Sequence, residues 1–300
     1  MPVVKVTLVG GAGGVGASVA FNLVLMHRDD EIVLVDNRPE MVTSHLMDLD
    51  QVLELSPGAR VRAGDAGDTD DADVVVLLSA TPLTVGTSRL EYLAKNAVIA
   101  NALIPPEDGV IVVVTNPVDP LVTRLQRRTG LDRRRILGYT INDSLRLRTG
   151  LARALGVPPR SVDAWAIGEH GDLSVPLFDR VTVNGEPVRP TPEQAAEAEE
   201  YFRSWYVRHV ALDSGRSSTW TSGLGIARMV AALDSDGELW PASIVLEGEY
   251  GIDGVALAVP VTIGRGGAAE IHEWELALRE LDALQAAAEL VRAAAASVPS

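Results

Sequence analysis

The first 140 residues alternate short apolar runs with segments of helical spacing. The apolar runs are rich in β-branched residues, which is typical of strands buried on both faces of a parallel sheet. They cover residues 3–9, 32–35, 74–78 and 110–114, and a further short strand is predicted near Ile136. Between them, the spacing predicts helices over residues 15–27, 39–53, 89–103 and 118–129. This alternation predicts an α/β fold with a doubly wound parallel sheet.

The pattern changes after Asn142, which is placed to cap a helix predicted over residues 143–155. Asn184 and Gly185 form a two-residue hairpin signal within residues 181–188. Further helices are predicted over residues 192–211, 217–232 and 274–295, and strands over 243–247 and 255–263. We therefore expect an N-terminal domain over residues 1–141 and a C-terminal α+β domain over 142–300. No clear linker separates them, so we expect them to share an interface.

Composition narrows the class of protein. A net charge of −15 argues against non-specific binding to nucleic acid and against docking on an anionic membrane. The absence of cysteine excludes disulfides, thiolate metal sites and cysteine nucleophiles. No apolar run reaches the ~18 residues of a membrane span, and the N-terminus lacks the pattern of a signal peptide. We therefore expect a cytoplasmic protein that binds neither nucleic acid nor membranes.

A glycine-rich turn follows the first predicted strand. Gly11, Gly13 and Gly16 satisfy the spacing G-x-G-x-x-G between a strand and a helix, where the backbone can approach a pyrophosphate at the helix N-terminus. We expect cofactor contacts from the whole turn: Gly10, Gly11, Gly13, Gly14, Val15 and Gly16. Asp36 ends the second strand and can bind ribose hydroxyls, which favours NAD. Two alternatives stay open: a purely steric role for the glycines, and a 2′-phosphate site at Arg38.

Three polar residues further on form a set suited to chemistry on a 2-oxo acid. Asp143 and Arg146 lie three residues apart on one predicted helix face, and His170 follows an apolar run in a glycine-flanked loop. Such a substrate needs a cation for its carboxylate, a proton at its carbonyl oxygen and a hydride donor at C2. Taken singly, an Asp-x-x-Arg pair is more often a surface ion pair, and a loop histidine is more often not catalytic.

Taken together and in order, these motifs resemble the lactate/malate dehydrogenase family over nearly the whole chain. The glycine turn is similar to the malate dehydrogenase form, which is one residue longer than that of lactate dehydrogenases. The 27-residue separation of Asp143 and His170 also matches the family. The motifs are the glycine turn, Asp36, Ser88-Arg89-Leu90, Asn96, Thr115-Asn116-Pro117-Val118-Asp119, Asp143-Ser144-Leu145-Arg146 and Gly168-Glu169-His170-Gly171-Asp172.

The resemblance implies a Rossmann domain for NAD, a C-terminal catalytic domain, and a role for each matched residue. His170 would be the acid/base and Asp143 would orient it. Arg146 would bind the substrate carboxylate, and Arg89, on a mobile loop, would polarise the carbonyl group. Asn116 would contact both the nicotinamide ribose and the substrate. The remaining implied contacts are Asn96 and Val114 to the cofactor, and Ser218 or Thr219 to the substrate. The family also implies a homodimer or homotetramer.

One position departs from the family. Six residues before Arg89, malate dehydrogenases carry an arginine that pairs the second carboxylate of their substrate, and lactate dehydrogenases usually carry glutamine. This chain has Leu83, and no basic residue lies between Arg62 and Arg89. Because an unpaired charge is expensive to bury, we expect a substrate with an apolar side chain. The alternatives are a shifted loop that leaves an ordinary malate or lactate dehydrogenase, and a dinucleotide-binding protein without turnover.

A second departure concerns regulation. Sugar-phosphate-activated bacterial lactate dehydrogenases use an arginine and a histidine across a subunit interface. Arg148 matches the first position, but Asp163 occupies the second. A carboxylate there would repel a bisphosphate, so we predict no such activation.

We predict no bound ligand at two other groups of residues. Six arginines gather between residues 124 and 135, and we interpret them as a solvated helix end rather than an anion site. The other histidines show no metal-ligand spacing, so we predict no metal; they are His27, His45, His209 and His272.

Overall fold

The computed structural model describes residues 4–26, 28–82 and 88–298. Its N-terminal half is a parallel sheet with the strand order β3-β2-β1-β4-β5-β6. The strands are β1 (Lys5–Val9), β2 (Glu31–Val35), β3 (Arg60–Ala63), β4 (Val74–Leu77), β5 (Val110–Val113) and β6 (Ile136–Tyr139). Each of the predicted strands is present, and the predicted α/β fold is confirmed. The sequence missed β3, because this edge strand is mostly exposed and carries two arginines in four residues.

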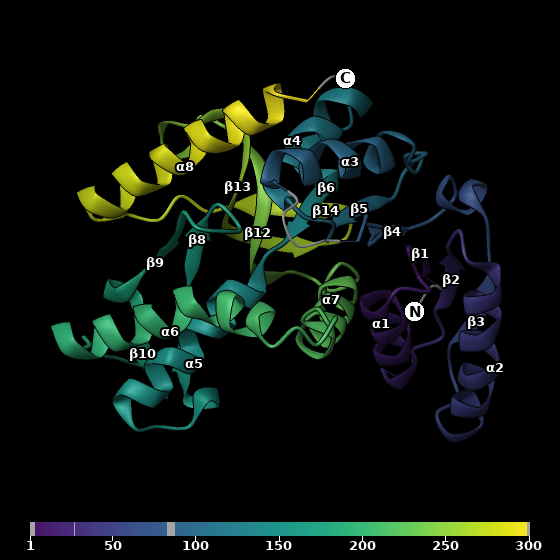
Figure 1. Cartoon of the computed structure of the whole chain (residues 1–300), viewed down its shortest axis with the longest axis horizontal. Coiled ribbons are helices and arrows are strands. Elements are labelled where there is room, and N and C mark those ends of the chain that lie inside the picture. The colour runs from purple at the N-terminus through teal and green to yellow at the C-terminus, as the bar shows by residue number, and fades with distance from the viewer. Residues whose placement is uncertain (1–3, 27, 83–87, 299–300) are drawn as a thin grey trace.

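Four helices connect these strands in the order of a doubly wound sheet (Figure 1). They are α1 (Gly14–Leu25), α2 (Pro39–Leu55), α3 (Arg89–Asn101) and α4 (Val118–Thr129). Their bounds agree with the predicted ones to within two residues at each described end. The parallel connection brings the carboxyl ends of β1, β4 and β5 to one edge of the sheet, which is where ligands bind in open α/β sheets.

The sheet continues from the first half of the chain into the second. β6 pairs antiparallel with β12 (Glu238–Glu247), through Tyr139 with Ala242 and Gly138 with Ser243. Beyond β12 the order is β13 (Asp253–Gly264), β8 (Ala166–Gly168) and β9 (Ser174–Pro176), with β14 (Gly267–Ile271) on β13. The described residues thus form one sheet of 11 strands that crosses the predicted boundary at residue 142.

The second half of the chain surrounds this extension with four helices: α5 (Ile141–Leu155), α6 (Pro192–Ala211), α7 (Thr219–Ala232) and α8 (Leu278–Ala296). A small separate sheet joins β7 (Val162–Asp163), β10 (Thr182–Val183) and β11 (Glu186–Pro187). The predicted hairpin is confirmed between β10 and β11, because Asn184 and Gly185 take φ values of 51° and 83°. None of the helices in the described part of the chain has the length and apolarity to cross a membrane.

Two predicted helix starts are wrong. Asn142 is not a cap, because α5 begins at Ile141, two residues before the predicted start, and the Asn142 amide bonds Tyr139 and Ser222 instead. The last helix begins at Leu278 rather than near residue 274. The segment before it is outside the helix, and its Trp274 backbone N–H donates to Tyr250 Oη at 2.9 Å.

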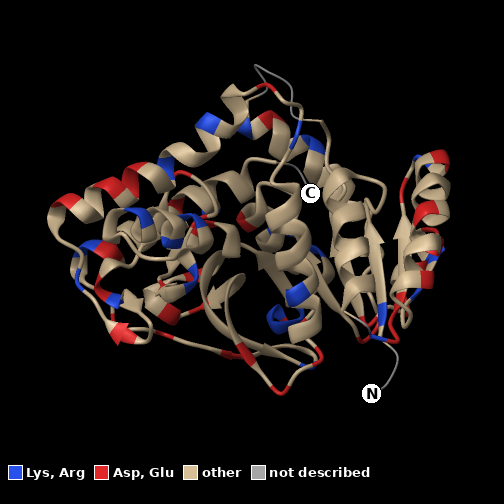
Figure 2. Ribbon diagram, turned by 90° about the horizontal axis from the view of Figure 1, so that it is seen from below, with Lys and Arg blue, Asp and Glu red and all other residues tan. Residues whose placement is uncertain are grey.

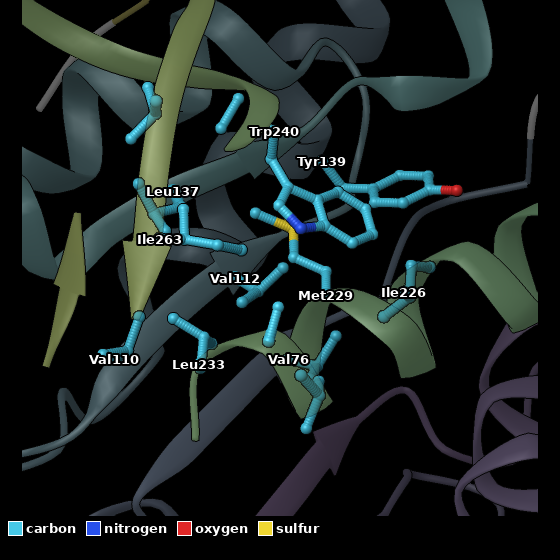
Figure 3. Packing of buried hydrophobic residues seen from close by; sticks show 14 of the residues in the cluster. Val76, Val110, Val112, Leu137, Tyr139, Ile226, Met229, Leu233, Trp240 and Ile263 are labelled. Atoms are coloured by element: carbon cyan, nitrogen blue, oxygen red, sulfur yellow. The ribbon is translucent and has the colours of Figure 1, made fainter. Parts of the chain in front are cut away.

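The main core joins the two halves of the chain. Side chains of the parallel strands, including Val76, Val112 and Leu137, pack against Ile226, Met229 and Leu233 of α7 and against Trp240 and Ile263 (Figure 3). Helix α7 also packs against α1, where Gly223 leaves room for the Ser18 side chain. Helix α7 therefore lies between the cofactor half and the extended sheet, and Thr219 at its start lies close to the glycine turn.

Candidate active site

The glycine turn is folded tightly at the carboxyl end of β1. Gly10 has a φ of 95°, and the backbone N–H groups of Gly10 and Gly11 both donate to the Val35 carbonyl, at 2.7 and 3.1 Å. A Cβ at Gly16 would overlap the Gly10 carbonyl oxygen, so helix α1 approaches the turn as only glycine permits. No side chain caps α1, because its N-cap is Gly13. The first turn of α1, at residues 14–16, therefore presents backbone N–H groups that no side chain caps, as a pyrophosphate site requires.

Asp36 lies beside this turn at the end of β2. One carboxylate oxygen accepts the Ala12 backbone N–H at 3.1 Å, and the other accepts the Nε–H of Arg38 at 3.0 Å. Burial by itself would raise the pKa of Asp36, but the charge and hydrogen bonds of Arg38 outweigh it and lower the pKa. Asp36 therefore stays ionised at neutral pH. The Arg38 side chain, which is half-exposed, is occupied by this pair.

Asn96 ties together the carboxyl ends of β4 and β5. Its side-chain amide is fully buried, donates to the Asn116 carbonyl at 2.7 Å and accepts the Thr81 backbone N–H at 2.8 Å. Asn116 itself precedes a cis peptide bond to Pro117, and Val114 follows β5 two residues earlier. All three residues expected near the cofactor thus lie at the edge of the sheet that carries the glycine turn.

The acid/base pair predicted from the sequence forms in the structure. His170 Nδ1 lies 2.5 Å from Asp143 Oδ2, and Arg146 donates to Asp143 Oδ1 at 3.1 Å. Burial would lower the pKa of His170, but the Asp143 carboxylate, with a smaller contribution from Asp119, raises it above its usual range. The Asp143 carboxylate therefore favours the protonated imidazole, which is the form that can donate a proton.

A cavity of about 90 Å³ opens beside Arg146. The indole of Trp205, on α6, stacks on the Arg146 guanidinium with 4.3 Å between the guanidinium carbon and the ring centroid. Ser218 lines the cavity, whereas Thr219 faces the glycine turn, with its Oγ1 3.8 Å from where a Cβ on Gly14 would lie. The full lining is Asn142, Leu145, Arg146, Thr149, Trp205, Ser218 and Thr221.

Arg89 lies on the other side of the His170 loop. It is the first residue of α3, and its guanidinium pairs with the buried carboxylate of Glu169. A second carboxylate, that of Asp172, lies 3.6 Å away. Half of the Arg89 side chain is exposed, so it can leave this pair for a ligand. Leu83 lies outside the described residues, within the segment 83–87.

Two residues at the site were not assigned a role from the sequence. Asp119 belongs to a quoted motif, yet its carboxylate contacts the backbone of His170, which is 51 residues away. Trp205 gave no signal, because an aromatic residue in a helix is usually packing. Neither contact has a sequence pattern of its own, since each depends on how separate elements meet.

The arginine cluster between residues 124 and 135 binds protein carbonyls. Arg124 donates to the carbonyl of Ala295 at the end of α8, and Arg128 to that of Leu103 after α3. These contacts complement the C-termini of α8 and α3, so the two side chains bind the protein and do not form the purely solvated helix end that the sequence predicted. Figure 2 shows acidic and basic residues interspersed along the helices at both ends of the molecule. Within residues 4–26, 28–82 and 88–298, no group of three His, Asp or Glu side chains is placed to hold a metal ion.

Models of known protein families match almost the whole chain. Residues 4–138 match the NAD-binding domain of lactate/malate dehydrogenase, and residues 140–298 match its α/β C-terminal domain. The chain belongs to the lactate/malate dehydrogenase family. It is therefore an NAD-dependent L-2-hydroxy acid dehydrogenase of the malate/lactate type, and the resemblance noted from its motifs is confirmed.

Individual relatives come from both branches of the family. The chain is 38% identical to a malate dehydrogenase of Halobacterium salinarum, over 96% of this chain and 97% of that one. It is 36% identical to L-lactate dehydrogenase 1 of Staphylococcus aureus, over 90% and 89%. Among solved structures, a minor L-lactate dehydrogenase from Enterococcus mundtii superposes with a TM-score of 0.89, and the malate dehydrogenase from Aeropyrum pernix with 0.90. Both are 27% identical, covering 99% and 98% of each chain respectively.

Proposed function

We propose that this dehydrogenase prefers 2-oxo and 2-hydroxy acids with an apolar side chain. The observation that carries the proposal is the charge of the cavity beside Arg146. Among the described residues that line it, Arg146 alone is charged, and Leu145 and Trp205 supply apolar surface. One guanidinium matches the single carboxylate of a monocarboxylic 2-oxo acid. The sequence adds Leu83 at the family's specificity position and no basic residue between Arg62 and Arg89.

The residues of the site divide the chemistry as follows. With Nδ1 held by Asp143, His170 would donate a proton from Nε2 to the carbonyl oxygen, and would take it back in the reverse direction. Arg146 would bind the carboxylate through two parallel N–H donors, and Arg89 would exchange Glu169 for the carbonyl oxygen. The glycine turn and Asp36 would hold NAD, whose nicotinamide would supply the hydride chemistry at C2.

The size of the preference follows from the charge of a second carboxylate. A dicarboxylic substrate needs a partner for that carboxylate, and Leu83, at the family's specificity position in the sequence, offers neither charge nor a hydrogen bond. Leaving a buried charge unpaired costs several kcal/mol, whereas an apolar side chain gains free energy by leaving water. We therefore expect kcat/KM to favour the apolar substrate by at least about tenfold.

Steady-state reduction of oxaloacetate, pyruvate and 4-methyl-2-oxopentanoate tests the proposal. The wild-type enzyme should show its highest kcat/KM with one of the last two. Leu83→Arg should shift the preference towards oxaloacetate, and Leu83→Gln is the matched control that adds polarity without charge. A clear wild-type preference for oxaloacetate would overturn the proposal.

A malate dehydrogenase proper is the second candidate, favoured by the 38% identity to the Halobacterium salinarum enzyme. It requires the loop containing Leu83 to turn this residue away and another cation to approach the substrate. In that case Leu83→Arg would leave the substrate preference nearly unchanged. The same kinetic panel therefore separates the two candidates.

Our proposal for the oligomeric state and the cellular location of the enzyme rests on its family. We propose a homodimer or homotetramer in the cytoplasm, as relatives of this type imply. Light scattering coupled to size-exclusion chromatography of the full chain would give the number of subunits. A monomer at micromolar concentration would contradict the proposal.

A further inference from the structure

A buried carboxylate contacts the loop that carries His170. Oδ2 of Asp119 accepts the backbone N–H of His170 at 2.7 Å, and Oδ1 accepts the hydroxyl of Ser243 at 2.6 Å. From this geometry we propose that Asp119 is a positioning residue for the reaction. It fixes the His170 loop and, through its negative charge, supports the protonated imidazole. This inference does not depend on which 2-oxo acid the enzyme prefers.

Three separate elements meet at the Asp119 carboxylate. Asp119 lies in the first turn of α4, where a negative charge also interacts favourably with the helix dipole. Ser243 lies within β12 and is fully buried. It is paired with Gly138 of β6, and a Cβ on that glycine would lie 2.7 Å from the Ser243 Cβ. Because Ser243 is fully buried against this glycine, its hydroxyl serves as an internal anchor for the carboxylate.

The link joins the cofactor side of the site to the acid/base. Asp119 is three residues beyond Asn116, the residue expected at the nicotinamide ribose, and both belong to the segment that leaves β5 and enters the first turn of α4. Through Asp119, this segment bonds directly to the backbone of His170. Asp119 is only 1% exposed, and burying a carboxylate costs free energy. A positioning role accounts for why the fold buries this charge.

The charged groups around His170 come from several elements. Asp143 and Arg146 face it from α5, and Asp119 from α4. Glu169 lies on the same loop, and its charge is paired with Arg89 of α3. Burial raises the pKa of Asp119 to about 6, although Ser243 and the His170 N–H oppose the shift. Above this pH Asp119 is mainly ionised and adds to the effect of Asp143 on His170.

The decisive variant is Asp119→Asn, which keeps the shape of the side chain and can still accept the His170 N–H. Without the charge, the pKa of His170 should fall by about half a unit or more. The alkaline limb of kcat/KM for 2-oxo acid reduction should move to lower pH by the same amount. The enzyme has five histidines, so NMR titration of the imidazoles follows His170 independently of turnover. His170→Ala identifies the resonance.

Ser243→Ala is the matched control, because it removes one anchor and keeps the charge. It should lower kcat, leave the Kd for NADH at the wild-type value, and lower the pKa of His170 less than Asp119→Asn does. A merely structural role for Asp119 predicts a loss of thermal stability with the His170 titration unchanged, and that result in Asp119→Asn would overturn the proposal. Should Asp119→Asn fail to fold, wild-type kcat together with a wild-type His170 titration in Ser243→Ala would overturn it instead.

Discussion

Replacing Asp119 by Asn should make the free energy of unfolding of the protein less dependent on pH. The pKa of Asp119 is raised from 3.8 to about 6 in the fold. A carboxyl group whose pKa is raised by folding contributes stability that is fully present below the unfolded pKa and is lost as the pH rises through the folded one. The shift of about two units therefore corresponds to about 3 kcal/mol, lost between acid and neutral pH. Asn does not titrate, so this loss is absent from the variant.

The range from pH 5 to pH 6.5 isolates the effect. It lies above the sequence pI of about 4.7, and the titration of His170 in the unfolded chain is common to both proteins, so it cancels from their difference. Over this range the free energy of unfolding of Asp119→Asn, minus that of the wild type, should rise by about 1 kcal/mol. A loss of stability that the substitution causes equally at every pH does not affect this change with pH.

Urea unfolding followed by tryptophan fluorescence measures the difference, because the chain holds five tryptophans. Both proteins must be studied at one subunit concentration, since association would add to the apparent stability. A difference that is independent of pH, or that falls as the pH rises, would refute the raised pKa. If the prediction holds, the wild-type enzyme retains a charge at Asp119 that destabilises its own fold at neutral pH.

Three further predictions concern the cofactor, the acid/base and regulation. Gly16→Ala should weaken NADH binding at least about tenfold in a fluorescence titration, because its Cβ would displace the Gly10 carbonyl in the phosphate cradle; unchanged affinity would contradict the proposed cradle. Reduction of 2-oxo acids should fall as the pH rises through the raised pKa of His170, and oxidation should fall as the pH drops below it; the same pH dependence in both directions would argue against this acid/base. Fructose 1,6-bisphosphate should not activate the enzyme, because the Arg148 guanidinium is paired with Asp163 at 2.6 Å; activation of several-fold would show that the pair opens.

Much of the fold could be read from the sequence because its signals are local. Continuous apolar runs fit only strands covered on both faces, and the helices between them fix their parallel order. The edge strand β3 was missed because its exposed arginines hide the pattern. β14 was missed too, because its five residues, Gly-Ala-Ala-Glu-Ile, carry little β-rich apolar character.

The sequence by itself determined the chemistry of this protein. The glycine turn needs conformations that only glycine adopts freely, and three-residue spacing on a helix places Asp143 and Arg146 on one face. Only the tertiary structure showed that Asp119, in addition to the predicted Asp143, contacts His170. Asp119 and Ser243 are 124 residues apart along the chain, and the bond between them exists because β12 pairs with β6 beside α4. No local pattern encodes such a contact, since it depends on the meeting of elements that are each specified separately.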